Sequence, residues 1–140
     1  MTLVRFGHNL ARDDRGQAVV ELALVAMVLV TLVFGGIEFG RMFNAWAIVT
    51  QASREGARTA AAQCSLSAGC DVLVRAAVEG SLTGLDVPAA RWEMDGGPYV
   101  SGAPVTVRVE YDVTPVIALI AALVPGGVLT VHGGTTMRLD

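Results

Sequence analysis

The feature that most constrains this chain is a long apolar segment close to its N-terminus. It runs from Ala18 to Ile37, 20 residues in which Glu21 is the only charged side chain. As an α-helix it would be about 30 Å long, which is the thickness of a bilayer's hydrocarbon core. The segment therefore predicts a membrane-spanning helix.

Glu21 is the unusual residue of this segment, because a carboxylate inside a membrane span costs a few kcal/mol or more and usually has a specific partner. Gly16 ends a short polar leader, and Glu21 takes the fifth position of the helix expected to start at Gln17. This arrangement resembles the class III signal of type IV pilins and pseudopilins. The resemblance implies that a prepilin peptidase cuts between Gly16 and Gln17.

The leader, Met1–Gly16, indicates the orientation of the chain. Its three arginines favour a cytoplasmic N-terminus and an exported C-terminal region, although Asp13, Asp14 and the arginines after the span weaken that signal. A secretory signal peptide is the competing interpretation, and it needs an apolar region of about 7 to 15 residues followed directly by small residues. Here the apolar run is longer, and the nearest small cluster, Ala60–Ala62, lies well beyond it. Conventional signal-peptidase cleavage is therefore disfavoured.

The helical pattern continues beyond the span. No proline occurs between Gln17 and Gln63, so one continuous helix of up to 47 residues is expected. Apolar residues recur on its second half at spacings of three and four: Phe39, Met42, Phe43, Trp46, Val49 and Ala52. The aromatic stripe Phe39, Phe43 and Trp46 is either a belt at the bilayer interface or a docking face for the chain's own domain. It does not form a cofactor box.

Two further motifs extend the resemblance. The residues I-E-F-G-R at 37–41 and A-S-R-E-G-A-R-T-A-A at 52–61 are similar to the TadE-like family of tight-adherence (Tad) pilus-assembly pseudopilins. Members of that family typically read G-Q-A-x-x-E, then a long apolar helix, then E-F-G-R and A-R-E-G-A-R. The resemblance covers Arg15 to about Ala62, roughly a third of the chain. Ser53 stands where alanine is common, and Val25–Met27 lacks the proline often found early in the span.

The resemblance implies both a location and a set of partners. The chain would sit in the cytoplasmic (inner) membrane as a single-pass protein, in contact with lipid, other Tad pilins and pseudopilins, the prepilin peptidase, the platform proteins and the assembly ATPase. Tad shaft pilins are very short and nearly all helix, whereas this chain carries a folded head, so a minor or priming pseudopilin is expected. The alternative is an uncleaved single-span protein whose head binds a ligand or partner at the membrane.

Charged and small residues flank the outer end of the span. Glu38 and Arg41 are one helical turn apart and are expected to pair at the membrane boundary. Gly36 and Gly40 are four apart and form a small-xxx-small face that another helix could contact. The alternative for these two residues is that glycine is simply tolerated in membrane helices.

The second family motif contains Arg54, Glu55, Gly56 and Arg58. The three charged residues are either functional or a solvated helix face. Glycine in the middle of a helix costs about 1 kcal/mol relative to alanine. Gly56 is therefore expected to mark a place where another element packs closely against the helix.

Glu21 is assigned a role in assembly and not in cleavage. After processing, Gln17 would carry a free α-amino group, about 6 Å from the Glu21 carboxylate along the helix axis. Either charge is costly to bury alone, so pairing between neighbouring subunits would neutralise both and fix their stagger. The alternative is that Glu21 stays hydrated near the cytoplasmic face and has no role.

Cys64 and Cys70 are the only cysteines, and both follow the long helix. An exported position and a flexible intervening segment favour a local disulfide, worth about 2 kcal/mol for so short a loop. Metal ligands are absent nearby, and the spacing is not that of a C-x-x-C redox motif. Asp71 is then expected to cap a short helix that runs to about Glu79 and ends at Gly80.

The last sixty residues change to the period of a β-strand. Valines alternate with polar residues from Val105 to Val113, which predicts a strand with one buried face. Trp92 and Met94 indicate a shorter strand before it, and Leu129–Leu139 indicates a third, with a bulge at Gly133–Gly134.

Between the second and third strands, Val116–Val124 is entirely apolar and lies between two prolines. Nine residues cannot span a bilayer. A short helix buried against the sheet is expected, and the alternative is an exposed patch that binds a partner.

The sequence offers little for catalysis. His8 lies in the leader and His132 in a predicted strand, no nucleophile triad or metal-ligand spacing occurs, and the Gly-Gly pairs lack a phosphate-loop pattern. We therefore expect no enzyme, no cofactor and no metal. All basic residues are arginines without a basic run, which argues against a nucleic-acid partner.

These predictions divide the chain into a prepilin leader (1–16), a transmembrane helix (17–40), an exported continuation of the helix (41–63) and a head (64–140). The expected fold class is α+β and pilin-like: a long N-terminal membrane-spanning helix that carries a small head with a three-stranded sheet and short helices.

Overall fold

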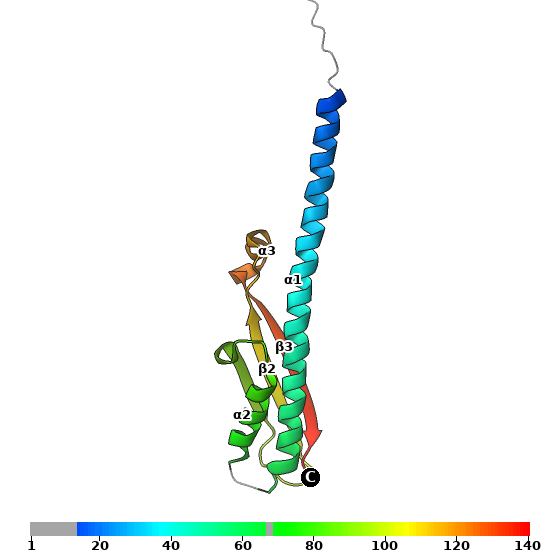
Figure 1. Ribbon diagram of the computed structural model, residues 1–140. Helices are drawn as coiled ribbons and strands as arrows, with labels where there is room; N and C mark the ends of the chain where they lie inside the picture. The colour runs from blue at the N-terminus through cyan, green and yellow to red at the C-terminus, as the bar shows by residue number, and fades with distance from the viewer. Residues whose placement is uncertain (1–13, 67–68) are drawn as a thin grey trace, which may run out of the picture. The chain divides into compact units, whose positions relative to one another are not determined.

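The computed structural model describes residues 14–66 and 69–140 (Figure 1). Predictions for residues 1–13 of the leader, His8 included, lie outside this part of the chain. The helices and strands, in chain order, are α1 (Asp14–Gln63), α2 (Cys70–Ser81), β1 (Ala90–Asp95), β2 (Pro104–Val113), α3 (Ala118–Leu123) and β3 (Leu129–Arg138). Two short 3₁₀ turns, Val87–Ala89 and Pro125–Gly127, precede β1 and β3.

The helix α1 is continuous over 50 residues, as the absence of proline predicts. The chain divides into two compact units at Gly35 and Gly36, within this helix. In the first unit, the apolar side chains from Val19 to Phe34 are exposed on every side of the helix. A helix that is apolar all round requires lipid or other apolar helices as its environment.

Within the described residues, α1 is the one helix long and apolar enough, by length and composition, to cross a membrane. This helix fits a single-pass membrane anchor, as the sequence predicts.

The second unit contains a three-stranded antiparallel sheet in the order β1-β2-β3. Along β2, Val105, Val107 and Val109 are fully buried, and the residues between them face away from the core. This is the period-two burial that the alternating valines predict. The fold class, a long apolar helix with a small α+β head, is confirmed.

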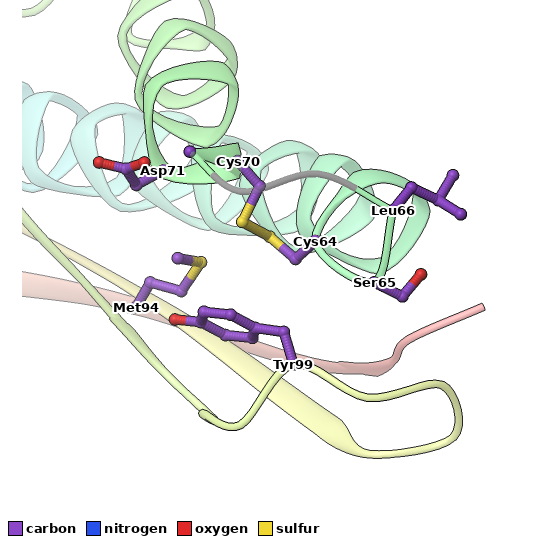
Figure 2. Close-up of a pocket in the computed structure, with 8 residues that line it drawn as sticks. Cys64, Ser65, Leu66, Cys70, Asp71, Met94 and Tyr99 are labelled. Carbon is purple, nitrogen blue, oxygen red and sulfur yellow. A yellow bond between two sulfur atoms is a disulfide. The ribbon is translucent and has the colours of Figure 1, made fainter.

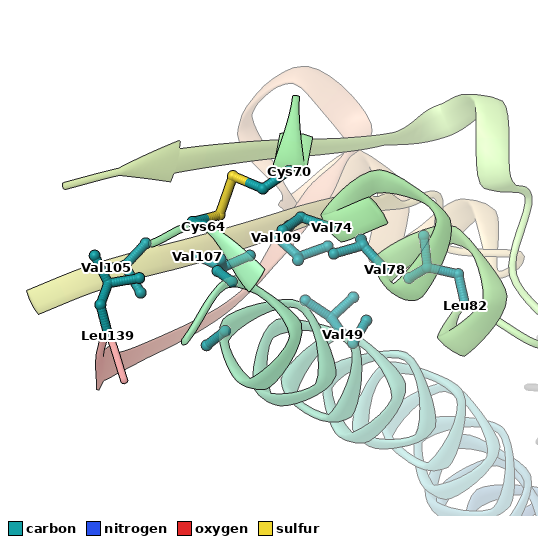
Figure 3. Close-up of a cluster of buried hydrophobic side chains, with 13 residues drawn as sticks. Val49, Cys64, Cys70, Val74, Val78, Leu82, Val105, Val107, Val109 and Leu139 are labelled. Atoms are coloured by element: carbon teal, nitrogen blue, oxygen red, sulfur yellow. A yellow bond between two sulfur atoms is a disulfide. The ribbon is translucent and has the colours of Figure 1, made fainter. Parts of the chain in front are cut away.

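One face of the sheet is covered by both α1 and α2. Figure 3 shows their side chains gathered with those of β2 into a single cluster. The helices contribute Val49, Ala52, Ala57 and Ala60 from α1 and Val74 and Val78 from α2. Small residues on α1 allow its backbone to come close to both α2 and β2. The core of the head therefore includes the second half of α1.

The bulge expected at Gly133–Gly134 is wrong, because β2 and β3 pair without interruption from Pro104 opposite Arg138 to Val113 opposite Leu129. Close packing, and not a bulge, explains why glycine occurs at position 133. A Cβ on Gly133 would lie 2.7 Å from the backbone oxygen of Val49, so β3 passes directly against the backbone of α1 at this point.

The burial expected for Val116–Val124 is also wrong. Residues 118–123 form the short helix α3, but its packing within the described chain is chiefly against the turn Pro125–Gly127 and not against the sheet. Val116 is 74% exposed, and Ala118 and Ala122 are exposed as well. The core face of the sheet is already covered by α1 and α2, which leaves no apolar surface there for α3 to bury.

The helix α2 starts and ends slightly differently from the prediction. It runs from Cys70 to Ser81, so Gly80 does not end it. Its N-cap is Gly69, in the left-handed conformation with φ of 92°, and no side chain caps it. Asp71 lies in the first turn, where its negative charge complements the helix dipole without acting as the cap.

Candidate functional site

The residues of the expected processing site lie at the start of α1. The helix begins at Asp14, so Gly16 and Gln17 are already within its first turns, and both are exposed. Glu21, one turn further on, is exposed too. The first N–H groups of a helix have no intrahelical partner, so unwinding this end to present an extended scissile bond costs little.

Glu38 is the most unusual side chain of the second unit, since it is charged and only 3% exposed. Arg41 Nη1 donates to Glu38 Oε1 at 2.9 Å, and 44% of the Arg41 side chain stays exposed. The backbone N–H of Val116 donates to the same carboxylate, at 3.4 Å to Oε1 and 3.3 Å to Oε2. The carboxylate thus links α1 to the segment that leads into α3.

The sequence predicts the Arg41 partner but not the Val116 partner. A signal for burial was present, because Glu38 precedes Ala45 by seven residues and so shares the helix face that continues through Val49 and Ala52. These three residues are buried in the head. An acidic residue on the core face of a helix needs hydrogen-bond donors, and the head supplies one.

The aromatic stripe of α1 does not dock on the head. Phe39, Phe43 and Trp46 are 67%, 56% and 47% exposed. Their rings contact one another, with centroids 6.4 Å apart for the two phenylalanines and 5.6 Å apart for Phe43 and Trp46. Of the two explanations that the sequence allows, the structure disfavours the docking face and leaves the interfacial belt.

Gly36 and Gly40 are exposed, and a Cβ built on either residue would meet no atom within 4 Å. No element of the described chain packs on this small-residue face. It is free to accept another helix, as the spacing of the glycines suggests.

The second family motif has one face toward the head and one toward solvent. A Cβ on Gly56 would lie 2.6 Å from Val78 Cγ2 and 3.0 Å from Val107 Cγ1, so glycine is required where α1, α2 and β2 meet. This confirms the close packing expected at Gly56. Arg54 and Arg58 are exposed and Glu55 is half-buried. Within residues 14–66 and 69–140, none of these three charges forms an ion pair.

Ser53, the departure from the family pattern, is fully buried. Its hydroxyl donates to the Thr50 carbonyl at 2.8 Å and lies 3.0 Å from Thr135 Oγ1 on β3. An alanine could not make this contact between α1 and the sheet. No pattern in the sequence indicates the Thr135 partner, 82 residues away along the chain.

The disulfide between Cys64 and Cys70 is formed, as predicted, and both residues are buried. Figure 2 shows that it joins the end of α1 to the start of α2, with Met94 and Tyr99 facing it across a cavity. The cavity has a volume of about 460 Å³. In the described part of the chain, no group of three His, Cys, Asp or Glu side chains could hold a metal ion.

The outer face of the sheet carries a polar network. Arg91 donates to both carboxylate oxygens of Asp112, at 2.8 and 3.1 Å, and Thr130 Oγ1 donates to Asp112 Oδ1 at 2.7 Å. These hydrogen bonds, that of Arg91 first, lower the pKa of Asp112 to about 2, and the same pairing raises the pKa of Arg91. The network links all three strands on an exposed surface. It therefore favours the observed register between neighbouring strands.

Comparison with known proteins identifies the N-terminal part of the chain. Residues 16–58 match the family model described as TadE-like protein, which confirms the resemblance seen in the motifs. No curated protein and no solved structure matches the chain. The TadE-like domain supports involvement in the Tad pilus system, and this pilus-associated family is structural and not typically enzymatic.

Proposed function

We propose that this chain, on the premise of its TadE-like domain, is a minor or priming pseudopilin that a prepilin peptidase processes after Gly16. One observation carries the proposal: the match begins at Gly16 and covers both the exposed apolar helix and the motif that packs into the head. Such a helix needs lipid before assembly and other apolar helices after it. The same helix anchors a folded head, as a pilin subunit requires.

Processing is tested at Gly16. The peptidase implied by the resemblance is a membrane aspartyl protease, and its confined site would accept a scissile bond in extended form with no side chain before the cut. Gly16→Val is expected to block cleavage, so the chain keeps its leader. Gly35→Val is the matched control, because a Cβ at Gly35 meets no atom within 4 Å and the residue is remote from the cut. Shortening of Gly16→Val by the mass of the leader would contradict cleavage at this glycine.

The proposed topology has residues 1–16 in the cytoplasm, 17–40 in the inner membrane, and 41–63 with the head, 64–140, exported. The chain would there contact the peptidase, the platform proteins and the assembly ATPase, together with other Tad pilins and pseudopilins. The disulfide supports an exported head, because disulfides persist in oxidising compartments. Protease accessibility in spheroplasts tests the orientation: an exported head is digested from outside the membrane, and a protected head would contradict the topology.

Within a filament, we assign Glu21 the role of pairing with the new α-amino group of Gln17 on a neighbouring subunit. That amine is protonated at neutral pH. Glu21 is exposed on α1, so its carboxylate is available to a partner. Pairing would neutralise two charges that are costly in an apolar environment and would fix the axial stagger of adjacent helices.

Glu21→Gln tests this role, since it keeps the size of the side chain and removes its charge. We expect normal cleavage and membrane insertion, with loss of piliation or of crosslinks to partner pilins. Thr31→Val is a suitable control, because it removes a polar group that bonds only within its own helix, at the Met27 carbonyl. Normal fibre numbers and crosslinks in Glu21→Gln would exclude the pairing.

The head supports a minor role. It carries a sheet, the packed helix α2 and the short helix α3, more than a shaft subunit resembling short Tad pilins would have. Gly36 and Gly40 would then contact the helix of a neighbouring pilin. Counting subunits in sheared filaments tests this assignment: this chain should be a small fraction of the total, and a fibre made mainly of it would contradict a minor or priming role.

A further inference from the structure

The segment around α3 is an apolar feature of the head that the fold leaves partly uncovered. From Val113 to Met137 the sequence contains no Asp, Glu, Lys or Arg, and Val116–Val124 is aliphatic throughout. Yet α3 contacts mainly the turn after it, and Val116, Ala118 and Ala122 are exposed. The exposed residues of this segment are aliphatic and no charged side chain accompanies them, so this surface favours an apolar environment.

The position of the segment identifies that environment. Val116 N–H is hydrogen-bonded to Glu38, and Glu38 directly follows Ile37, the last residue of the apolar span. If the span crosses a bilayer, the membrane boundary passes close to Glu38. The helix α3 begins two residues after Val116. The exposed aromatic stripe Phe39, Phe43 and Trp46 follows Glu38 on α1, and tryptophan is typical of such a boundary.

We propose that α3, with Val116, is a second membrane contact that inserts into the interfacial region of the leaflet from which α1 emerges. Six helical residues extend about 9 Å, and a helix this short can lie in the plane of the interface with its apolar side chains at the boundary between headgroups and acyl chains. These helical residues cannot reach across the hydrocarbon core, and the hydrated interface can satisfy the backbone groups at their ends. The proposal rests on the membrane anchorage in the proposed function, and it adds a contact between the head and the lipid.

Depth-dependent quenching by brominated lipids tests the insertion. The full chain, with Trp46 and Trp92 replaced by Phe, receives one tryptophan at a time and is reconstituted in phosphatidylcholine vesicles. The reporter in the segment is Ala122→Trp, the head control is Val72→Trp, and the span control is Val28→Trp; all three positions are exposed. We expect bromine near the headgroup end of the acyl chain to quench Ala122→Trp strongly and Val72→Trp not at all.

The span control separates the two proposals. Quenching of Val28→Trp by bromine near the chain ends, without quenching of Ala122→Trp, would overturn the insertion of α3 and leave the anchor intact. Failure of both reporters would reject the anchor as well. A blue-shifted emission of Ala122→Trp without quenching, which is lost when the lipid-to-protein ratio is raised, would show that a second copy of the chain, and not lipid, covers α3.

A charge in the segment provides a second test. Ala118→Glu replaces an exposed residue, so the fold of the head should tolerate it. We expect it to remove the quenching of Ala122→Trp, because the carboxylate resists transfer into the interface, while Val28→Trp in the same background stays quenched. Undiminished quenching of Ala122→Trp in this variant would contradict insertion.

Discussion

The backbone N–H of Val116 donates hydrogen bonds to both carboxylate oxygens of Glu38, across 78 residues of sequence. The family motif E-F-G-R therefore does more than pair charges on one helix. Glu38 joins α1 to the segment before α3. The partly exposed guanidinium of Arg41 neutralises the charge of the Glu38 carboxylate. A buried acid at this point secures the head to the helix where the apolar segment ends.

Glu38→Ala is expected to loosen this junction. It leaves the part-buried Val116 N–H without its carboxylate acceptor, and a hydrogen bond to a charged group contributes about 1.5 to 3 kcal/mol. Hydrogen exchange on the full chain in detergent micelles should show faster exchange of the Val116 amide. The control Glu79→Ala removes an exposed glutamate of α2 and should leave that amide protected. Unchanged protection in Glu38→Ala would show that the hydrogen bond does not hold the segment.

Gly56→Ala is expected to destabilise the head. The added Cβ would clash with Val78 Cγ2 at 2.6 Å, on a stiff β-branched side chain. Overpacking of this kind costs about 1 to 3 kcal/mol, partly offset by roughly 1 kcal/mol of helix propensity. Urea unfolding in micelles measures the difference.

Gly80→Ala provides the matched comparison, because it is the same change on α2 where a Cβ meets nothing within 4 Å. It should be neutral or stabilise the head by about 0.5 to 1 kcal/mol. Equal effects of the two variants would refute the packing role of Gly56.

Two adjacent glycines of β3 should respond differently to alanine. A Cβ at Gly133 would lie 2.7 to 2.9 Å from backbone atoms of Val49 and Thr50, which cannot move aside like a side chain. At Gly134 the nearest atom is Arg108 Cγ, at 3.8 Å. We expect Gly133→Ala to lower the free energy of unfolding by about 1 to 3 kcal/mol or more, and Gly134→Ala to change it little. The reverse order in urea unfolding would mean that β3 does not rest on α1.

These glycines also show where prediction from sequence stops. Alternating valines are enough to predict β2, because burial on one face of a strand has a period of two residues. The same pattern cannot tell a bulge from a close approach, since both favour glycine. The close approach is the correct explanation for Gly133, and it becomes visible only in the contact between α1 and β3, two segments distant in sequence.

The exposure of α3 and the Val116 partner of Glu38 were likewise not predictable, because both depend on contacts between distant segments. An aliphatic run between two prolines predicts a short helix, but whether it is buried depends on which elements already cover the sheet. The core face is covered by α1 and α2, so α3 lies outside it. The Arg41 partner of Glu38 is local and could be predicted from helical spacing, whereas the Val116 partner depends on the tertiary fold.

The Asp112 network predicts a dependence of stability on pH. The pKa of Asp112 is lowered from its ordinary value of 3.8 to about 2, so between these values the folded chain binds fewer protons than the unfolded chain. Its contribution to stability is therefore present above about pH 4 and is lost as the pH falls through about 2. Asp112→Asn should flatten the stability profile in this window.

Urea unfolding between pH 5 and pH 2 measures the free energy of unfolding as a function of pH. The range ends at pH 2 because the pKa of Asp112 is lowered to about 2. Asp95→Asn removes another exposed strand carboxylate and should leave the slope as in the wild type. Since Asp112 is solvent-accessible, salt should reduce its contribution. If Asp112→Asn left the pH dependence of the free energy of unfolding unchanged, the ion pair between Arg91 and Asp112 would not persist in solution.

The most direct test of the account is the intact mass of the chain from the membrane fraction of cells with an active Tad system. A processed pseudopilin should have the mass of residues 17–140 less two hydrogens for the Cys64–Cys70 disulfide. The same chain from Gly16→Val cells should start at Met1. A wild-type chain that also starts at Met1 would contradict processing, and with it the assignment of this protein as a pseudopilin.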